Sequence, residues 1–233
     1  MDCALVLCSG GLDSVTTAHY VKKVLKYGVI NILFFNYCQR TLEEERRAAK
    51  ECAKDLGAEF IEINLDWVRR FSDSMINSND KAKKINRKDL GNTEKESKKW
   101  YVPYRNSIFL SCAFSVAESL YIKENEKYDI FVGFKNEGKE SYPDTTKDFI
   151  EIMNNMGKIN NSVGFEIISP LIDKDKEDIV LMASKMGIDM TKTFSCYVGP
   201  NIHCGNCLAC KLRQEGFYWA GINDPTKYAN ELK

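Results

Sequence analysis

Residues 3–14 read CALVLCSGGLDS, and this stretch decides the fold. Residues 5–7 are an apolar run typical of a buried strand, and the run ends at a Ser-Gly-Gly turn. Behind the turn, Val15, Ala18 and Val21 recur at helical spacing within residues 13–25. The stretch therefore predicts a strand, a tight turn and an amphipathic helix in direct succession.

The turn has the composition of an anion-binding site. Gly10 and Gly11 let the backbone approach a ligand closely, and the helix behind them directs unpaired N–H groups to the same point. Ser9 and Ser14 add hydroxyl groups, and the carboxylate of Asp13 is a good Mg²⁺ ligand. This combination fits pyrophosphate bound with a metal ion. It matches neither the Walker loop nor the Gly-x-Gly-x-x-Gly dinucleotide fingerprint.

The rest of the chain continues the alternation of strand and helix. Strand patterns cover 29–37, 59–65, 128–134 and 165–168. Helical patterns cover 41–56, 107–120, 148–156 and 176–186, and glycines follow the first and the last of them. Short links between alternating elements predict an α/β fold with a doubly wound, mainly parallel, Rossmann-like sheet. We expect this domain to span residues 1–190.

Composition narrows the class of protein. The 233 residues include 33 Lys and Arg and 33 Asp and Glu, so the chain has no general excess of basic charge for nucleic acid. No apolar run approaches the roughly 18 residues that cross a bilayer. The first residues carry no basic leader. We expect a cytoplasmic protein that does not engage a membrane.

A basic segment interrupts the regular pattern. Residues 81–100 contain eight Lys and Arg but three Asp and Glu, with little apolar periodicity. One interpretation is a solvated loop, and the other is a flap that closes over an anionic ligand. The sequence favours a mobile stretch over about residues 66–101.

Nine cysteines need two explanations. Five are scattered through apolar or helical segments and are typical of small buried hydrophobic residues: Cys3, Cys8, Cys38, Cys52 and Cys112. Four are clustered near the C-terminus: Cys196, Cys204, Cys207 and Cys210. Four sulfurs at this spacing predict a structural zinc in a small lobe over residues 191–233, with an iron–sulfur cluster as the alternative. His203 is interpreted as a neighbour of the ligands rather than a ligand.

The string at 9–14 resembles the PP-loop of the ATP pyrophosphatase superfamily, whose fold is adenine nucleotide α-hydrolase-like. Further strings in the same order resemble the 7-cyano-7-deazaguanine synthase (QueC) family. They lie at 37–40 with Glu44, 102–106, 109–111, 133, 142–144, 170–171 with Lys176, 193–197, 204–207, 210 and 213.

This resemblance implies a ligase that uses ATP and ammonia. Members of the family adenylate the carboxylate of 7-carboxy-7-deazaguanine, release pyrophosphate, and form first an amide and then a nitrile for queuosine biosynthesis. Adenylation replaces a poor leaving group by AMP, so the enzyme has to position the reactants and neutralise the phosphates. Ammonia reacts as the neutral amine, which a closed and dry site favours.

The resemblance also implies roles for individual residues. ATP and Mg²⁺ are expected at Ser9, Gly10, Gly11, Leu12, Asp13, Ser14, Arg105 and Asn106. The catalytic residues are expected to be Asp13, Arg105 and Lys176, although Lys176 could equally be a surface lysine. The deazaguanine substrate is expected to contact Gln39, Arg40, Tyr142 and Asp144, of which the first two could equally belong to a polar loop.

The chain departs from the family pattern around the substrate. The family string VPGRN is here VPYRN, with Tyr104 at the glycine position, and D-x-S-G-Y-P-D-C-R is here GKESYPDTT at 138–146. A second hypothesis is therefore a QueC-like paralogue, as in anti-phage systems, that activates a deazaguanine acid for amide formation or for transfer to a protein or nucleic-acid amine. A homodimer is expected by analogy. A tRNA sulfurtransferase and a zinc-knuckle binding module fit the strings less well.

Overall fold

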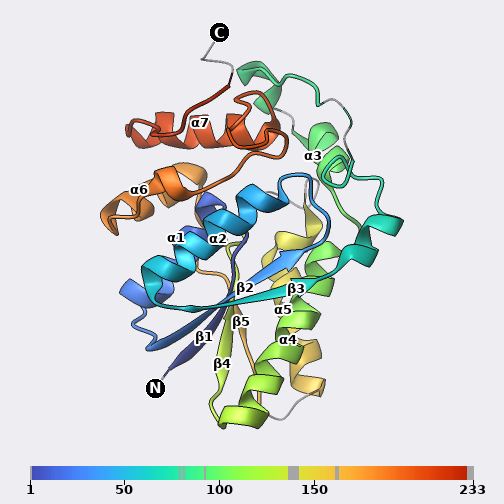
Figure 1. Cartoon of the computed structure of the whole chain (residues 1–233), viewed down its shortest axis with the longest axis vertical. Helices are drawn as coiled ribbons and strands as arrows, with labels where there is room; N and C mark the ends of the chain where they lie inside the picture. Colours follow the sequence, from blue (N-terminus) through green and yellow to red (C-terminus); the bar gives the residue numbers. More distant parts are fainter. Residues whose placement is uncertain are drawn as a thin grey trace.

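The computed structural model describes residues 2–78, 80, 82–91, 93–135, 142–160 and 163–229. Its centre is a sheet of five parallel strands in the order β3-β2-β1-β4-β5 (Figure 1). The strands are β1 (Cys3–Leu7), β2 (Val29–Asn36), β3 (Glu59–Asn64), β4 (Tyr128–Phe131) and β5 (Ile167–Ile168). The predicted doubly wound α/β fold is confirmed.

Helices cover both faces of the sheet. One face packs against α1 (Leu12–Lys23), α2 (Leu42–Leu56) and α6 (Lys176–Lys185), and α7 (Leu208–Ala220) packs on α6 (Figure 1). The other face packs against α4 (Arg105–Glu124) and α5 (Lys147–Asn160). The central strand supplies both cores, because alternate residues of a strand point to opposite faces.

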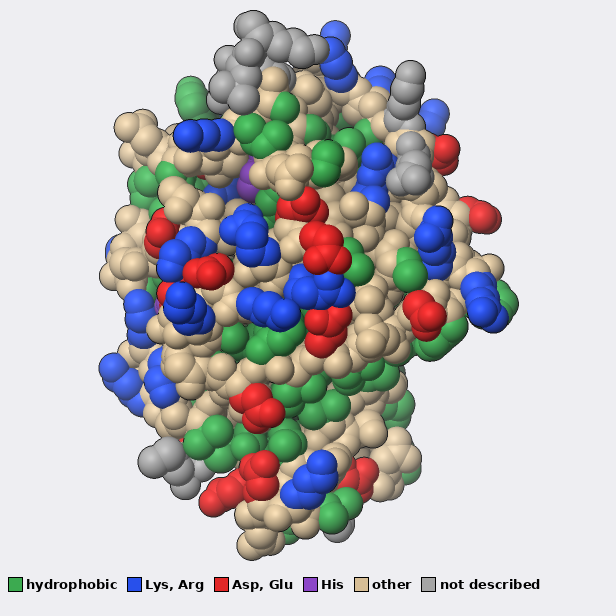
Figure 2. All heavy atoms as spheres, viewed as in Figure 1, with side chains coloured by type: hydrophobic (Ala, Val, Ile, Leu, Met, Phe, Trp, Pro, Cys, Tyr) green, Lys and Arg blue, Asp and Glu red, His purple; other side chains and the backbone are tan. Residues whose placement is uncertain are grey.

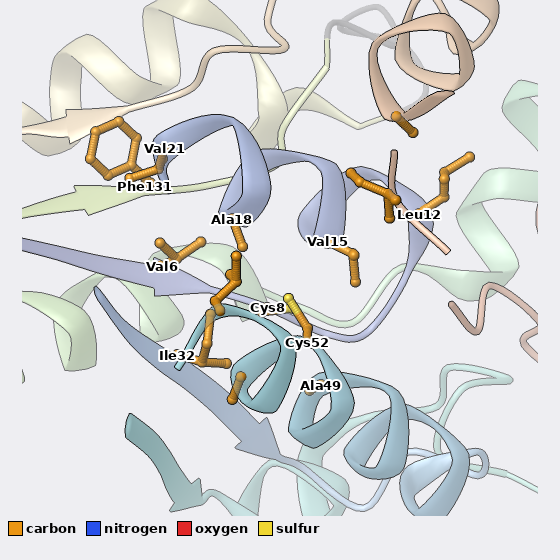
Figure 3. Close-up of a cluster of buried hydrophobic side chains, with 14 of the residues drawn as sticks. Val6, Cys8, Leu12, Val15, Ala18, Val21, Ile32, Ala49, Cys52 and Phe131 are labelled. Atoms are coloured by element: carbon orange, nitrogen blue, oxygen red, sulfur yellow. The ribbon is translucent and has the colours of Figure 1, made fainter. Parts of the chain in front are cut away.

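Strand β1 shows this alternation residue by residue. Ala4 and Val6 face the core beneath α1 and α2, where Cys8 and Cys52 also lie (Figure 3). Cys3 and Leu5 face the core beneath α4. Both faces are buried, which is why β1 reads as a continuous apolar run.

The surface over α2 is charged with both signs. Figure 2 shows Lys and Arg side chains interspersed with Asp and Glu over this helix. Arg46, for example, pairs with Glu43 and with Glu62 of β3. The balance of charge seen in the composition therefore also holds locally on this face.

The strand order indicates which edge of the sheet binds ligands. From β1 the chain winds outward to β2 and β3, then returns to pair β4 on the other side of β1. Ligands of open α/β sheets bind where the winding reverses, outside the carboxyl ends of the strands. The Ser-Gly-Gly turn after β1 and Gly133 after β4 both lie at this edge.

The four strands after β1 are all shorter than predicted, and β4 and β5 differ most; side chains bond to the backbone around these two strands. Asn154 of α5 accepts from the N–H of Ile167 at 2.7 Å and donates to its carbonyl at 3.0 Å. The hydroxyl of Ser169 donates to the carbonyls of Val132 and Phe134. β5 starts at Ile167 rather than at position 165, and β4 ends at Phe131 rather than at position 134.

The described part of the basic segment contains short helices: η1 (Asp66–Phe71), η2 (Arg87–Gly91) and α3 (Glu94–Trp100). Trp100 is 1% exposed and its ring lies 5.1 Å from that of Tyr197. The N–H of Ile85 donates to the carbonyl of Asn206 at 2.9 Å. Positions 79, 81 and 92 lie outside the described residues. Mobility and closure of this segment stay predictions.

A buried arginine ties α7 to the stretch of chain that follows α6. Arg213 of α7 donates to Thr193 at 2.8 Å, to Ser195 at 3.2 Å and to the Met190 carbonyl at 3.1 Å. These bonds fix the strand-like stretch that leads to the first clustered cysteine. Among the described residues, every helix is too short or too polar to span a bilayer.

Candidate active site

The Ser-Gly-Gly turn is held tightly between two helices. Gly10 has a φ of +77°, and a Cβ there would lie 2.6 Å from Ala48 Cβ and from the Glu45 carbonyl. The carbonyl of Gly10 accepts the N–H of Phe194 at 2.8 Å. Only glycine combines this backbone conformation with so close an approach. The turn is thus fixed against both α2 and the C-terminal region.

Helix α1 begins at this turn and points its first N–H groups outward. Gly11 is the N-cap, and the Ser14 hydroxyl donates to its carbonyl at 3.1 Å. The hydroxyls of Ser9 and Ser14 lie 3.3 Å apart. A Cβ on Gly133 would lie 3.0 Å from the backbone of Asp13 and Ser14, so the end of β4 abuts the turn. The result is a compact nest suited to a phosphate group.

Asp13 and Lys176 form an ion pair across the turn. The Lys176 ammonium donates to both carboxylate oxygens of Asp13 at 2.7 Å. Lys176 is the first residue of α6, whose N-cap Asp175 and Asp178 form a capping box. Both side chains of the pair are partly exposed. A carboxylate that could hold a metal ion and an ammonium that could bind a phosphate are therefore placed together.

A cavity of about 290 Å³ opens beside this pair. Its wall includes most of the residues predicted to bind nucleotide or substrate or to act in catalysis: Ser9, Gly11, Leu12, Asp13, Ser14, Gln39, Arg105, Asn106 and Lys176. Four others of this group are not in its wall: Gly10, Arg40, Tyr142 and Asp144. Gly10 belongs to the same turn and packs against α2. Much of the remaining wall is aromatic: Phe34, Phe35, Tyr37, Phe109, Phe134, Phe194 and Tyr197.

Arg105 is the cation of the aromatic half of the cavity. Its guanidinium lies 5.7 Å from the ring centre of Tyr37 and 6.0 Å from that of Phe109. One Nη donates to the Tyr37 hydroxyl at 3.4 Å, while the buried Nε has no partner among the described residues. Burial lowers the pKa of Arg105, but the neighbouring Tyr37 and other acidic groups raise it further. Its charge is permanent and remains free for a ligand.

Asp144 lies behind this arginine. Asn106 donates to the Asp144 backbone carbonyl at 3.1 Å, which ties the turn at 143–145 to the start of α4. Burial raises the pKa of the Asp144 carboxyl, while Arg105 acts in the opposite direction. The oxygen Oδ1 is buried and lacks a partner in the described part of the chain. Asp144 therefore keeps one buried acceptor atom, outside the cavity wall. The preceding residues 138–141 lie outside the described ranges.

Gln39 and Arg40 have different surroundings. The Gln39 amide donates to the Phe35 carbonyl at 3.0 Å and to Glu45 at 3.1 Å, and it accepts the Tyr37 N–H at 2.9 Å. These bonds commit the buried amide to the protein. Arg40 instead donates to the Asp80 carbonyl at 3.0 Å. Contact of either residue with substrate stays a prediction.

Glu45 is a cavity residue that the sequence analysis missed. Its carboxylate accepts the Thr41 hydroxyl at 2.7 Å and the Gln39 amide, and it belongs to the cavity wall. Burial raises the pKa of Glu45 to about 7. The helical periodicity could have predicted this position. Residue 45 precedes Ala48 and Ala49 by three and four residues, so it lies on the same buried side of α2.

The four clustered cysteines converge on one point. Their sulfur atoms all lie within 4.8 Å of one another. The pairs Cys196–Cys207 and Cys204–Cys210 are 3.9 Å and 4.0 Å apart. Four thiolates about 2.3 Å from a zinc ion form a tetrahedron with edges of about 3.8 Å. The observed spacing fits a four-sulfur zinc site.

Backbone N–H groups support the charge of these sulfurs. Cys196 Sγ accepts from Val198, Gly199 and Cys204, with the shortest distance 3.1 Å. Cys204 Sγ accepts from the N–H groups of residues 206 and 207. Such donors stabilise thiolates, which are the form that binds zinc. A zinc ion held by four cysteines has no open position for substrate.

His203 is a neighbour of the cysteine cluster, in agreement with its sequence interpretation. Its Nε2 accepts the Ser195 N–H at 3.0 Å, and its ring lies 4.6 Å from that of Phe194. Burial lowers the pKa of His203 to about 4, so the ring is neutral near pH 7. Ser195 and Tyr197 also line the cavity. The cysteine knuckle thus fixes one wall of the site.

Comparison with known proteins gives a consistent result over nearly the whole chain. The model of the family described as "Queuosine biosynthesis protein QueC" matches residues 3–221. A 7-cyano-7-deazaguanine synthase of Methanobrevibacter smithii is 33% identical over 229 residues, covering 97% of each chain. The synthase of Nitratiruptor sp. is 36% identical over 227 residues, covering 97% of this chain and 98% of the relative.

Proposed function

The chain belongs to the QueC family of queuosine biosynthesis proteins, and from this membership we propose that it adenylates 7-carboxy-7-deazaguanine and converts it with ammonia into the amide and then the nitrile. It is an enzyme of the ATP-using, carbon–nitrogen bond-forming class. One observation carries the assignment. A phosphate-binding turn with an Asp13–Lys176 pair and an aromatic half containing Arg105 share one cavity.

The turn serves the phosphates of ATP. The N–H groups at the start of α1 and the hydroxyls of Ser9 and Ser14 converge at the mouth of the nest. They offer donors to the pyrophosphate that leaves when the bond between the α- and β-phosphates breaks. Lys176 adds a point charge for the same leaving group. The backbone N–H groups are fixed by the start of α1, whereas Lys176 and the Ser14 hydroxyl exchange their present partners, Asp13 and the Gly11 carbonyl, for phosphate oxygens.

Mg²⁺ would be held by Asp13 in this proposal. A carboxylate with partly exposed oxygens, next to bound phosphates, is the ordinary protein ligand of Mg²⁺. The ion would neutralise phosphate charge. Lys176 holds the Asp13 carboxylate in place in the absence of nucleotide, and phosphate oxygens then offer the ammonium a second anionic partner.

The aromatic half serves the deazaguanine acid. Phe35 and Phe109 stack at 4.2 Å in the cavity wall, and an aromatic side chain of this wall can pack against a planar bicyclic ring. Arg105 supplies the positive charge that a substrate carboxylate requires. Asp144 is proposed to accept from the N–H groups of a guanine-like edge, and this contact requires its buried Oδ1 to open toward the cavity, whose wall does not include it. The carboxylate is thereby directed toward the α-phosphate of ATP.

The reaction follows from this arrangement. A substrate carboxylate oxygen attacks the α-phosphorus, the bond to the β-phosphate breaks, and pyrophosphate leaves. Ammonia then attacks the acyl carbon and AMP departs, which gives the amide. Adenylation of the amide oxygen and loss of a second AMP give the nitrile. The aromatic side chains of the wall would limit the access of water, which would otherwise hydrolyse either adenylate.

The zinc site has a structural role in this proposal. The four sulfurs fill a tetrahedral coordination sphere, and the knuckle holds the stretch at 195–197 against the cavity. Loss of the metal would therefore disturb both folding and one wall of the active site.

Product analysis tests the function. The protein is incubated with ATP, Mg²⁺, ammonium chloride and 7-carboxy-7-deazaguanine, and products are measured by mass spectrometry together with AMP and pyrophosphate. We expect the nitrile, with two AMP for each nitrile formed. AMP release that is independent of the acid would contradict the proposal.

Tyr104 supports a second candidate function. It occupies a left-handed backbone conformation, with a φ of +54°, and its side chain is 74% exposed next to Arg105. A large exposed aromatic residue at the family's glycine position suits contact with a bulky acceptor. The paralogue hypothesis therefore predicts that the acid is activated but ammonia is used poorly. Accumulation of adenylate or amide without nitrile in the same assay would favour this candidate.

A further inference from the structure

Glu45 is a carboxylate in the cavity that the proposed chemistry leaves without a role. It projects from the first turns of α2 into the wall formed by Gln39, Tyr37 and Arg105. Its two oxygens accept from a hydroxyl and from an amide, both of them neutral donors. Among the described residues its carboxylate forms no ion pair within salt-bridge distance. A buried carboxylate held in this way can accept a further cationic donor.

The two glutamates that precede Glu45 in the sequence bind other residues. Glu43 is 77% exposed at its side chain and pairs with Arg46. Glu44 accepts the backbone N–H of Asn201 at 2.9 Å. The three consecutive carboxylates therefore point in three directions, and only Glu45 belongs to the cavity wall. Glu43, which is outside the cavity wall, can therefore serve as the control position for Glu45.

The polar bonds of Glu45 fix its position. Gln39 is anchored by the backbone at Phe35 and Tyr37, and its remaining N–H points to Glu45. Thr41 is the N-cap of α2 and holds the other carboxylate oxygen. Gln39 thus acts as a positioning residue rather than as a free ligand. The carboxylate is preorganised within the same cavity as Asp13 and Arg105.

We propose that Glu45 is an ammonium-binding subsite and the general base that converts ammonium into ammonia for attack on the adenylate. This inference rests on the proposed function. In neutral solution the nitrogen source is almost entirely ammonium, which has no lone pair for attack. A carboxylate with free acceptor capacity in the cavity wall binds that cation and takes one of its protons.

The charges around Glu45 suit such a base. Burial raises its pKa to about 7, the bonds from Thr41 and Gln39 and the charge of Arg105 lower it, and Glu44 raises it. Lys176 and Asp13, which also line the cavity, form an ion pair with each other. A base works best when its pKa is near the operating pH, and Glu45 meets this condition.

The step balances in atoms and charge. Ammonium gives one proton to the Glu45 carboxylate and becomes ammonia. The ammonia lone pair forms the C–N bond with the acyl carbon of the adenylate. The bond from that carbon to the AMP oxygen breaks, and its electron pair stays on AMP. The second nitrogen proton passes to the phosphate of the departing AMP, which leaves the neutral amide and a protonated Glu45.

The test compares Glu45→Gln with the wild type in two half-reactions. Adenylation is measured without any amine, as exchange of labelled pyrophosphate into ATP in the presence of 7-carboxy-7-deazaguanine. Amide formation is then measured with ammonium chloride or with hydroxylamine. Hydroxylamine is already neutral near neutral pH and needs no base to free its lone pair. The matched control is Glu43→Gln, which removes one carboxylate from the same helix but outside the cavity.

We expect Glu45→Gln to keep the wild-type exchange rate and to lose about 100-fold or more in kcat/KM for ammonium. Turnover with hydroxylamine should stay close to that of the wild type, and Glu43→Gln should behave as wild type with both amines. An equal loss with both amines, or no loss with ammonium, would overturn the inference while leaving the proposed function intact. Absence of acid-dependent exchange in the wild type would instead refute the proposed function, and the inference with it.

Discussion

The phosphate-binding turn and the cysteine knuckle both contain charged groups, but they differ in how far these groups are exposed. The turn keeps Asp13 and Lys176 partly exposed, paired with each other and open to ligands. The knuckle buries three of its four sulfurs and surrounds them with backbone donors. The difference teaches where function and stability reside. Open charges are available to change partners in a reaction, whereas enclosed charges hold the fold together.

The largest effect should follow from changing the open region. Asp13→Ala should abolish AMP formation, by at least about 10³-fold, because the phosphates lose the carboxylate that places their counter-ion. The free energy of unfolding should change little, since Asp13 is partly exposed at the start of α1. Acid-dependent AMP release and thermal unfolding measure the two quantities. Appreciable turnover in this variant would remove the turn from the mechanism.

The enclosed region should respond in the opposite way. Cys207→Ser should release zinc and lower the free energy of unfolding by about 3 kcal/mol or more, because a structural metal contributes directly to folding. Metal analysis and denaturant unfolding provide the measurement, and Cys112→Ser, outside the cluster, serves as the control. A wild-type protein without bound zinc and an unchanged unfolding curve in the variant would argue against a zinc knuckle.

The pH dependence of the free energy of unfolding tests a third kind of group, the buried and neutral side chain of His19. Burial lowers the pKa of His19 to about 4, and its Nδ1 has no partner among the described residues. Above the unfolded-state pKa of about 6.5 the ring is neutral in both states. As the pH falls toward 4, protonation favours the unfolded chain, at a cost of at most about 3 kcal/mol. Denaturant unfolding at several pH values should show a weaker decline for His19→Asn than for the wild type.

The smallest effect concerns backbone strain at Tyr104, the residue that precedes Arg105 of the cavity wall. Tyr104→Gly should raise the free energy of unfolding by about 1 kcal/mol, since glycine adopts the left-handed conformation without a Cβ penalty. Asn125→Gly, at another left-handed position remote from the cavity wall, is the control for the backbone effect alone. Activity that changes only in the Tyr104 variant would link this side chain to the acceptor. A loss of stability in that variant would contradict the strain argument.

The sequence predicted what depends on neighbours in the chain. The turn at 9–14, the alternation of elements and the spacing of Cys204, Cys207 and Cys210 are local patterns, and each corresponds to a feature of the structure. The end of α2 is another example, because Gly57 adopts the left-handed conformation that ends the helix there.

The sequence could not predict what depends on distant segments. Glu45 is one of three consecutive glutamates, and only the packing of α2 shows which of them enters the cavity. Arg213 would pass for a surface residue of an amphipathic helix, yet it is 1% exposed and bonded to the stretch after α6. The Asp13–Lys176 pair joins residues 163 positions apart. Such contacts form only when distant segments of the chain are brought together in the folded structure.

The central claim is that the turn at 9–14 grips the leaving pyrophosphate of ATP. A crystal structure with an ATP analogue that resists cleavage between its α- and β-phosphates tests it most directly. The account predicts β- and γ-phosphate oxygens within hydrogen-bonding distance of the N–H groups that begin α1 and of Lys176 Nζ. A triphosphate bound elsewhere, with the turn empty and Lys176 still on Asp13, would contradict it.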